Sequence, residues 1–272
     1  MKNKPNIVPS SGKFVKVNNI NIYYEECGKG ETLILLHGGT ATISMWKKEV
    51  ISKFAKYFRV ITPDSRGHGK TDNPKKEMNY QLMADDTAAF IKVLGIDKPF
   101  VCGYSDGGQV ALELGIRYPG LCRGLVIGAT WFKMSNNYKK ILKNYGFTGK
   151  GRVDIDYIEK GNPGTIKAWK REHVDPNNPE KWKTMLQEVS VMWWTPLSYS
   201  RPDFKKIKDP SLILMGDRDG FIPIEQALQM YKFIAGAELA ILPNTTHASA
   251  FQKPELFIKT VLDFLLRNVI KA

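Results

Sequence analysis

The chain has 272 residues, of which 43% are apolar and 25% are charged, and its formal net charge is +13. This length suits one large core, and no apolar run approaches the roughly 18 residues that a membrane-spanning helix needs. The first residues include lysines but no apolar stretch behind them, which argues against a secretory signal, so we expect a cytoplasmic protein.

The basic residues are spread along the chain in short pairs, for example at positions 47–48 and 139–140. They form no stripe, and no nucleic-acid-binding motif accompanies them. We interpret the charge as a solvated, lysine-rich surface and expect neither a nucleic acid nor a membrane as partner. A small-molecule substrate is the partner that we expect, and the sequence leaves the oligomeric state open.

The predicted elements begin with a β-hairpin, because residues 14–27 alternate between apolar and polar side chains around a turn at Asn18. Strands and helices then alternate, in chain order: strand 32–36, helix 45–57, strand 58–63, helix 80–94, strand 100–104, helix 109–118, strand 125–129, strand 212–215, helix 224–233, strand 239–242 and helix 254–269. This alternation indicates an α/β fold with a mostly parallel central sheet and helices on both faces. The leading hairpin supplies an antiparallel edge.

The alternation stops between residues 132 and 204, in a stretch that is prone to helix but interrupted by glycine and proline. Together with Trp131 just before it, this stretch holds five of the six tryptophans in the chain. An aromatic insertion between two core strands, with few strand signals of its own, indicates a helical cap over a pocket. We therefore expect a core of residues 1–131 and 205–272 and a helical cap insertion of residues 132–204.

A Gly-x-Ser-x-Gly motif, Gly103 to Gly107, joins the predicted strand 100–104 to the helix that follows it. At such a nucleophile elbow the strand turns sharply into the helix and leaves the serine hydroxyl exposed, and the small neighbours make room for the strained backbone. The motif in this context predicts that Ser105 is a nucleophile.

Serine is a poor nucleophile at neutral pH and needs a base, which an acid orients in turn. His247 follows the last predicted strand, and two acids, Asp217 and Asp219, follow the strand before it. The carboxyl ends of parallel strands form one rim of a sheet, so residues far apart in sequence can meet there. We expect Ser105 and His247 to meet one of these acids on that rim.

These motifs resemble those of the α/β-hydrolase superfamily over nearly the whole chain, least in the cap. The likeness rests on Leu-Leu-His-Gly-Gly at 35–39, Asp-Ser-Arg-Gly-His-Gly at 64–69, the elbow, and Gly-Asp-Arg-Asp at 216–219 followed by His247. The resemblance implies an α/β-hydrolase fold whose catalytic residues follow the chain order Ser…Asp…His. It selects Asp219 as the catalytic acid, and Asp217 becomes a turn residue.

The resemblance also implies an oxyanion hole formed by the backbone N–H groups of Gly39 and Asp106, with Thr40 as the alternative to Gly39. In the implied mechanism, His247 takes the proton of Ser105, an acyl-enzyme forms, and water then releases the acid. This chemistry needs no cofactor, and no cluster with metal-ligand spacing occurs in the sequence.

The three other histidines are expected to be structural or peripheral. His37 lies in the His-Gly-Gly loop and His68 in the Arg-Gly-His-Gly turn, and we interpret both as structural. His173 falls in the predicted cap, where it could touch substrate, but a surface position is the interpretation that we favour.

Substrate choice is predicted from the residue after the nucleophile and from the tryptophans. The elbow resembles the biphenyl-hydrolase-like branch, which includes amino-acid ester hydrolases, and there an Asp at the position of Asp106 is associated with a substrate amine. The alternative is that Asp106 caps the helix or forms a local salt bridge. Trp131, Trp193 and Trp194 are the candidates for the pocket wall.

The sequence thus predicts a serine hydrolase that cleaves small carboxylic esters through an acyl-enzyme, with amino-acid esters as one substrate class. The alternatives on the same fold are a small-amide aminopeptidase, a lactonase and a hydrolase of C–C bonds in ring-cleavage products, because fold alone does not decide function. A hydrolase-like receptor that binds a small molecule with little turnover is the alternative from another class.

Overall fold

The computed structural model describes residues 11–270. The strands of its central sheet are β1 (Lys13–Val17), β2 (Ile20–Cys27), β3 (Thr32–Leu36), β4 (Arg59–Pro63), β5 (Phe100–Tyr104), β6 (Gly124–Gly128), β9 (Ser211–Gly216) and β10 (Glu238–Leu242). The helices around the sheet are α1 (Lys48–Phe54), α2 (Tyr80–Val93), α3 (Asp106–Arg117), α9 (Ile224–Phe233), α10 (Ser249–Gln252) and α11 (Pro254–Ile270).

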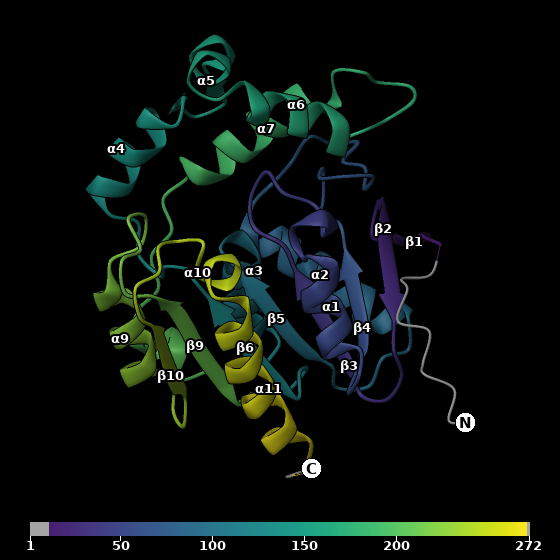
Figure 1. Cartoon of the computed structure of the whole chain (residues 1–272), viewed down its shortest axis with the longest axis vertical. Coiled ribbons are helices and arrows are strands. Elements are labelled where there is room, and N and C mark those ends of the chain that lie inside the picture. Colours follow the sequence, from purple (N-terminus) through teal and green to yellow (C-terminus); the bar gives the residue numbers. More distant parts are fainter. Residues whose placement is uncertain (1–10, 271–272) are drawn as a thin grey trace.

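The sheet has eight strands in the order β1-β2-β4-β3-β5-β6-β9-β10 (Figure 1). β1 pairs antiparallel with β2 and β2 with β4, whereas every other neighbouring pair is parallel. The predicted mostly parallel sheet with an antiparallel hairpin at its edge is therefore confirmed.

Two helices begin at residues other than those predicted. The helix expected from residue 45 begins at Lys48, because Ile43–Met45 forms a separate 3-10 turn and Trp46 is extended and buried. The helix expected from residue 109 begins at Asp106, directly after Ser105. The elbow thus passes from strand to helix without any intervening loop.

The sheet is covered on both faces, as the continuous apolar runs predicted. In β3, Leu33 and Leu35 belong to the apolar cluster formed with α1 and α11, and Ile34 and Leu36 to the cluster formed with α2, α3 and α9. Successive side chains of a strand point to opposite faces, so a strand between two helical layers is apolar at every position. This packing holds the ends of β5, β9 and β10 in a fixed arrangement.

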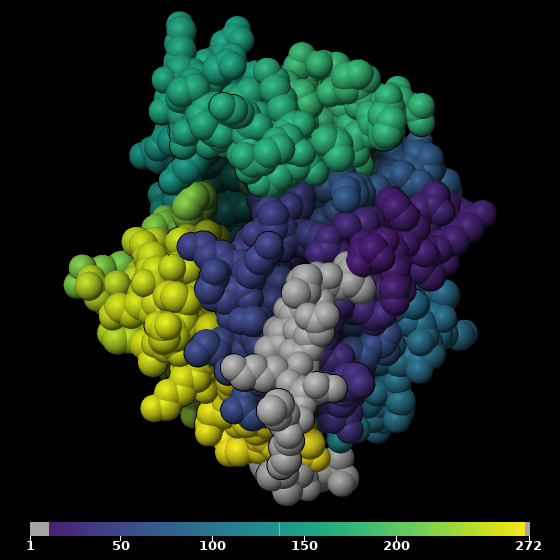
Figure 2. All heavy atoms as spheres, turned by 45° about the vertical axis from the view of Figure 1, so that its right-hand side comes forward, coloured from purple at the N-terminus to yellow at the C-terminus, as the bar shows by residue number. Residues whose placement is uncertain are grey.

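The segment between β6 and β9 forms a separate lobe over one end of the core (Figures 1 and 2). It comprises α4 (Asn136–Asn144), β7 (Phe147–Gly149), β8 (Arg152–Val153), α5 (Ile155–Gly161), α6 (Pro163–Glu172) and α7 (Lys181–Trp193). The short helix α8 (Arg201–Phe204), at the end of the segment, packs against α9 of the core. The small β7–β8 hairpin was not expected from the sequence. Within residues 11–270, no helix is long and apolar enough to cross a membrane.

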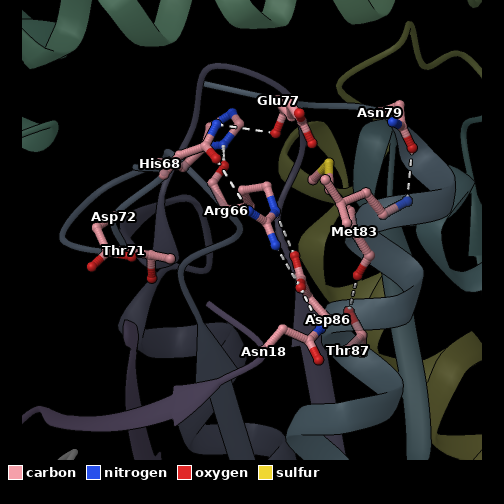
Figure 3. A network of polar contacts seen from close by, with 12 residues as sticks. Asn18, Arg66, His68, Thr71, Asp72, Glu77, Asn79, Met83, Asp86 and Thr87 are labelled. Atoms are coloured by element: carbon pink, nitrogen blue, oxygen red, sulfur yellow. Dashed lines mark hydrogen bonds and ion pairs between the residues drawn. The ribbon is translucent and has the colours of Figure 1, made fainter. Parts of the chain in front are cut away.

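A buried ion pair ties the rim loop after β4 to α2 (Figure 3). Arg66 donates two hydrogen bonds of 2.7 Å to the carboxylate of Asp86, and both side chains are about 4% exposed. Asn18, in the β1–β2 turn, donates a third bond of 2.8 Å to the same carboxylate. These bonds join three segments that are distant in sequence and compensate the charges that burial removes from water.

We expect the Asp86→Ala substitution to lower the free energy of unfolding by about 3–5 kcal/mol, because it leaves the Arg66 guanidinium buried without its counter-charge. The neighbouring Asp85 is the matched control, since its pair with Arg117 is about one third exposed on each side. Asp85→Ala should cost less than about 1 kcal/mol. Urea unfolding of both variants measures the difference, and equal losses would contradict this account.

Candidate active site

Ser105 lies at a strained turn between β5 and α3, with φ of 57° and ψ of −117°. A side chain at Gly103 would overlap the carbonyl of Gly107, and one at Gly107 would overlap the carbonyl of Leu36. The two glycines are therefore required by close backbone contacts. They allow the turn that presents the Ser105 hydroxyl.

His247 lies within hydrogen-bond distance of both Ser105 and Asp219. His247 Nε2 is 2.9 Å from Ser105 Oγ, and His247 Nδ1 is 2.8 Å from Asp219 Oδ2. The Asp219 side chain is fully buried, and its Oδ1 accepts bonds from the backbone N–H groups of residues 221 and 222. An ionised Asp219 accepts the Nδ1–H of His247, which leaves Nε2 free to accept the proton of Ser105.

Asp217, the other acid of the same turn, is exposed, and its side chain is hydrogen-bonded to neither Ser105 nor His247. Its Oδ1 accepts a 3.0 Å bond from the backbone N–H of Thr245, two residues before His247. Asp217 therefore connects the turn after β9 to the loop that carries the histidine.

The loop after β3 runs beside Ser105. His37 Nε2 accepts a 2.9 Å bond from the backbone N–H of Ser65, so its Nδ1 carries the proton and donates to the carbonyl of Gly38 at 2.7 Å. In a trans peptide the C=O and N–H point in opposite directions, so this bond turns the N–H of Gly39 away from His37. Gly39 and Asp106 line the same cavity as Ser105, as an oxyanion hole requires; their role in one stays a prediction.

The side chain of Asp106 is buried and bonded from two directions. Tyr80, at the start of α2, donates its hydroxyl to Oδ1, and Trp193, from α7 of the cap, donates its Nε1–H to Oδ2, both at 2.8 Å. Burial raises the pKa of Asp106 to about 6, although these two bonds favour the carboxylate. The sequence suggested a local cap or salt bridge as the alternative role, and the observed bonds instead connect the core to the cap.

A cavity of about 430 Å³ opens above Ser105 between the core and the cap. Trp131 and Trp193 are among the residues that line it, and their contact with a substrate stays a prediction. Trp194 is not among the lining residues, and its Nε1 donates a 3.1 Å bond to the carbonyl of Phe147. Trp194 therefore supports the β7 strand of the cap, where the sequence suggested a pocket wall.

Several lining residues were not predicted. They are mainly apolar or aromatic side chains of the cap and of the loop after β9: Tyr138, Leu142, Tyr145, Phe147, Tyr157, Ile158, Trp169, Phe221 and Ile222. The amphipathic spacing of the cap helices indicated a buried face but not which part of that face borders a cavity. Tyr80 was missed for the same reason, since its contact with Asp106 is visible only in the folded chain.

Among the described residues, the cavity is lined by no permanently charged cation that could bind an anion. Of the described residues that line it, none is a lysine or arginine, and the acidic side chain among them is Asp106. A carboxylate on a substrate would therefore meet the Asp106 side chain without a compensating cation, which costs free energy in a site shielded from water.

His37, His68 and His173 are all about 1% exposed and form a row of imidazoles, with ring centroids 5.2 and 5.8 Å apart. The expectation of a surface position for His173 is wrong, because its ring lies against the core and is hydrogen-bonded to the backbone of Gly69 and Thr40. Burial lowers the pKa of each of the three, so neutral forms are favoured.

Comparison with known proteins places these features in context. The family model described as alpha/beta hydrolase fold matches residues 31–254. One curated relative, a 2-hydroxy-6-oxo-6-(2'-aminophenyl)hexa-2,4-dienoic acid hydrolase of Metapseudomonas resinovorans, is 28% identical over 94% of this chain and 91% of its own.

Solved structures share the architecture at lower identity. A meta-cleavage product hydrolase from Pseudomonas fluorescens IP01 superposes with a TM-score of 0.76 at 21% identity, over 94% of this chain and 98% of that one. An enol-lactonase from Burkholderia xenovorans LB400 gives a TM-score of 0.72 at 22% identity, over 93% and 100%. None of these three proteins is named as an amino-acid ester hydrolase, so they support the broader resemblance and not the branch that the elbow suggested.

Proposed function

The chain belongs to the alpha/beta hydrolase fold family, and we propose that it is a serine hydrolase in which Ser105 forms an acyl-enzyme. The observation that carries the proposal is the continuous set of hydrogen bonds from Ser105 through His247 to the buried Asp219, beneath an aromatic cavity. His247 accepts the hydroxyl proton as Ser105 attacks a carbonyl carbon, and it then donates that proton to the leaving group.

The N–H groups of Gly39 and Asp106 would stabilise the oxyanion formed in this step, and Asp219 would stabilise the imidazolium. Water deprotonated by His247 attacks the acyl carbon in the second step, and the proton returns to Ser105 as the acid leaves. Trp131 and Trp193, which line the cavity, would contact the substrate.

We propose an uncharged or cationic carboxylic ester as the substrate class, because the described lining holds the acid Asp106 and neither lysine nor arginine. Small lactones share this chemistry. Each oxygen of the Asp106 carboxylate accepts one bond from the protein and keeps a further acceptor position, so a substrate ammonium can be its third partner.

Hydrolysis of a C–C bond in a ring-cleavage product is the second candidate, and the named relatives favour it over small esters. Two of the relatives described above are by name hydrolases of a dienoic acid and of a meta-cleavage product. The composition of the cavity lining argues against this candidate. Among the described lining residues there is no lysine or arginine that could pair with the carboxylate of a dienoate.

A substrate panel decides between these candidates. It contains p-nitrophenyl acetate and butyrate, an aminoacyl ester, an aminoacyl anilide, a γ-lactone and 2-hydroxy-6-oxo-6-phenylhexa-2,4-dienoate, each assayed with wild-type protein and Ser105→Ala. We expect turnover of the esters that is lost in Ser105→Ala. Turnover of the dienoate with none of the esters would replace the leading proposal by the second, and binding without turnover would favour a receptor.

For Asp106, we expect the Asp106→Asn variant to lose kcat/KM selectively on the aminoacyl ester, at least about tenfold more than on the butyrate ester. A hydrogen bond between charged groups contributes about 1.5–3 kcal/mol, which corresponds to this range. An equal loss on both esters would mean that Asp106 serves only to hold Tyr80 and Trp193, and it would sink the proposed amine contact.

A further inference from the structure

His173 connects the cap to two loops of the core rim. It follows α6 directly, and its Nδ1 accepts a 2.8 Å bond from the backbone N–H of Gly69. A neutral imidazole that accepts at Nδ1 carries its proton at Nε2, and Nε2 lies 3.0 Å from the carbonyl oxygen of Thr40. Burial lowers the pKa of His173 to about 4, so this neutral form persists near pH 7.

Thr40 is the residue next to Gly39, the expected oxyanion donor, and its backbone is strained. Its φ of 54° lies in the left-handed region, which residues other than glycine adopt only where the surrounding structure supports it. Within the turn, the N–H of Ala41 bonds the carbonyl of Gly38 at 3.4 Å, a long hydrogen bond that contributes little. The conformation of the turn therefore depends on contacts from outside it.

Two imidazoles supply such contacts. His37 donates to the carbonyl of Gly38, and His173 donates to the carbonyl of Thr40. The Gly38–Gly39 and Thr40–Ala41 peptide groups are therefore held, one on each side of the Gly39–Thr40 peptide. The first contact comes from the core and the second from the cap. The turn that carries the Gly39 N–H is thus contacted from both parts of the chain.

We propose that His173 is a positioning residue for the oxyanion hole: its Nε2–H holds the Thr40 carbonyl and so keeps the Gly38–Ala41 turn in the conformation that presents the Gly39 N–H to the substrate. This inference rests on the proposed serine hydrolase function. It makes formation of the oxyanion hole depend on the docked position of the cap.

Other residues of the cap bond to parts of the core outside the Gly38–Ala41 turn. Lys181, at the start of α7, donates bonds of 2.8 Å to the carbonyls of Gly69 and Thr71 and so attaches the cap to the rim loop after β4. It does not contact the Gly38–Ala41 turn. Glu172 accepts bonds from the hydroxyls of Thr42 and Ser44, just beyond that turn. Lys181 therefore offers a control for cap attachment alone.

Two substitutions of His173 separate its two bonds. In His173→Asn the amide oxygen takes the place of Nδ1 and keeps the Gly69 bond, but nothing reaches Thr40. In His173→Gln the amide nitrogen takes the place of Nε2 and keeps the donor to Thr40. We expect kcat for p-nitrophenyl butyrate to fall at least about tenfold in His173→Asn, with KM changed less than about twofold, and to recover to within about threefold in His173→Gln.

A second measurement avoids turnover. The rate at which Ser105 reacts with a fluorophosphonate, whose phosphoryl oxygen occupies the oxyanion hole, should fall and recover in parallel with kcat. Lys181→Met should lower the midpoint of thermal unfolding but leave kcat within about twofold of wild type. A loss of kcat in Lys181→Met equal to that in His173→Asn would overturn the inference, because loosening of the cap would then explain both.

The outcomes separate this inference from the function on which it rests. Wild-type protein that neither hydrolyses any member of the substrate panel nor reacts with the fluorophosphonate would overturn both. Active wild-type protein whose kcat is unchanged by His173→Asn would overturn the role of His173 alone. A fall in kcat that His173→Gln does not reverse would also overturn it, since the lost group would then not be the donor at Nε2.

Discussion

Replacing Ser105 with alanine is expected to lower kcat for ester hydrolysis by on the order of 10⁵–10⁶, the loss typical of removing the nucleophile of a serine hydrolase. The loss arises because no acyl-enzyme can form, while substrate still binds in the cavity above the elbow. Steady-state and single-turnover assays with p-nitrophenyl esters measure it. The burst of p-nitrophenol that acylation produces should vanish together with turnover.

The free energy of unfolding of Ser105→Ala shows whether the variant is still folded, and so serves as its control. Alanine keeps a Cβ at the strained backbone position, where φ is 57°, so the free energy of unfolding should change by less than about 1 kcal/mol. Ser105→Gly should be equally inactive but more stable than Ser105→Ala by about 1 kcal/mol, because glycine adopts this conformation without strain. More than about 1% residual activity in either variant would show that another group is the nucleophile.

Replacing Asp219 with asparagine is expected to lower kcat by on the order of 10⁴ through a change of tautomer. Oδ1 of Asp219 accepts bonds from two backbone N–H groups, so the oxygen of the asparagine side chain must stay there and its NH₂ group must face His247. A donor at that place favours the histidine tautomer with the proton on Nε2. That tautomer cannot accept the proton of Ser105.

Asp217→Asn is the matched control for Asp219→Asn. The carboxylate of Asp217 accepts a bond from the N–H of Thr245, and an asparagine oxygen can accept the same bond. We expect kcat within about threefold of wild type in this variant. A larger loss in Asp217→Asn than in Asp219→Asn would assign the acid role to Asp217 and contradict the geometry on which the mechanism rests.

The core, and the rim of the sheet on which Ser105, Asp219 and His247 lie, were predictable because their signals are local. Strands buried on both faces are continuous apolar runs, and β3 and β5 coincide with the predicted ranges residue for residue. The elbow combines a fixed glycine spacing with a junction between a strand and a helix, so a stretch of about a dozen residues is enough to locate it. Helix starts were less accurate, since α1 begins only after a 3-10 turn that has no distinctive sequence pattern.

The cap was predictable as a helical insertion but not in its contacts. Its tryptophans indicated an apolar interior, yet Trp193 contacts Asp106 while the adjacent Trp194 turns to the β7 strand. Neighbouring residues on a helix point in different directions, so which of them reaches the cavity depends on how the helix lies over the core.

The sequence by itself determined the α/β architecture, the elbow at Ser105 and the placement of His247 and Asp219 on one rim, because each of these depends on periodicity or on a short motif at the end of a strand. Only the tertiary structure decided what surrounds Ser105. The bonds from Trp193 to Asp106 and from His173 to Thr40 span 87 and 133 residues, and no local pattern encodes the docking of a cap on its core. Whether Asp106 is a helix cap or a cavity residue, and whether His173 is exposed or buried, depends on that docking.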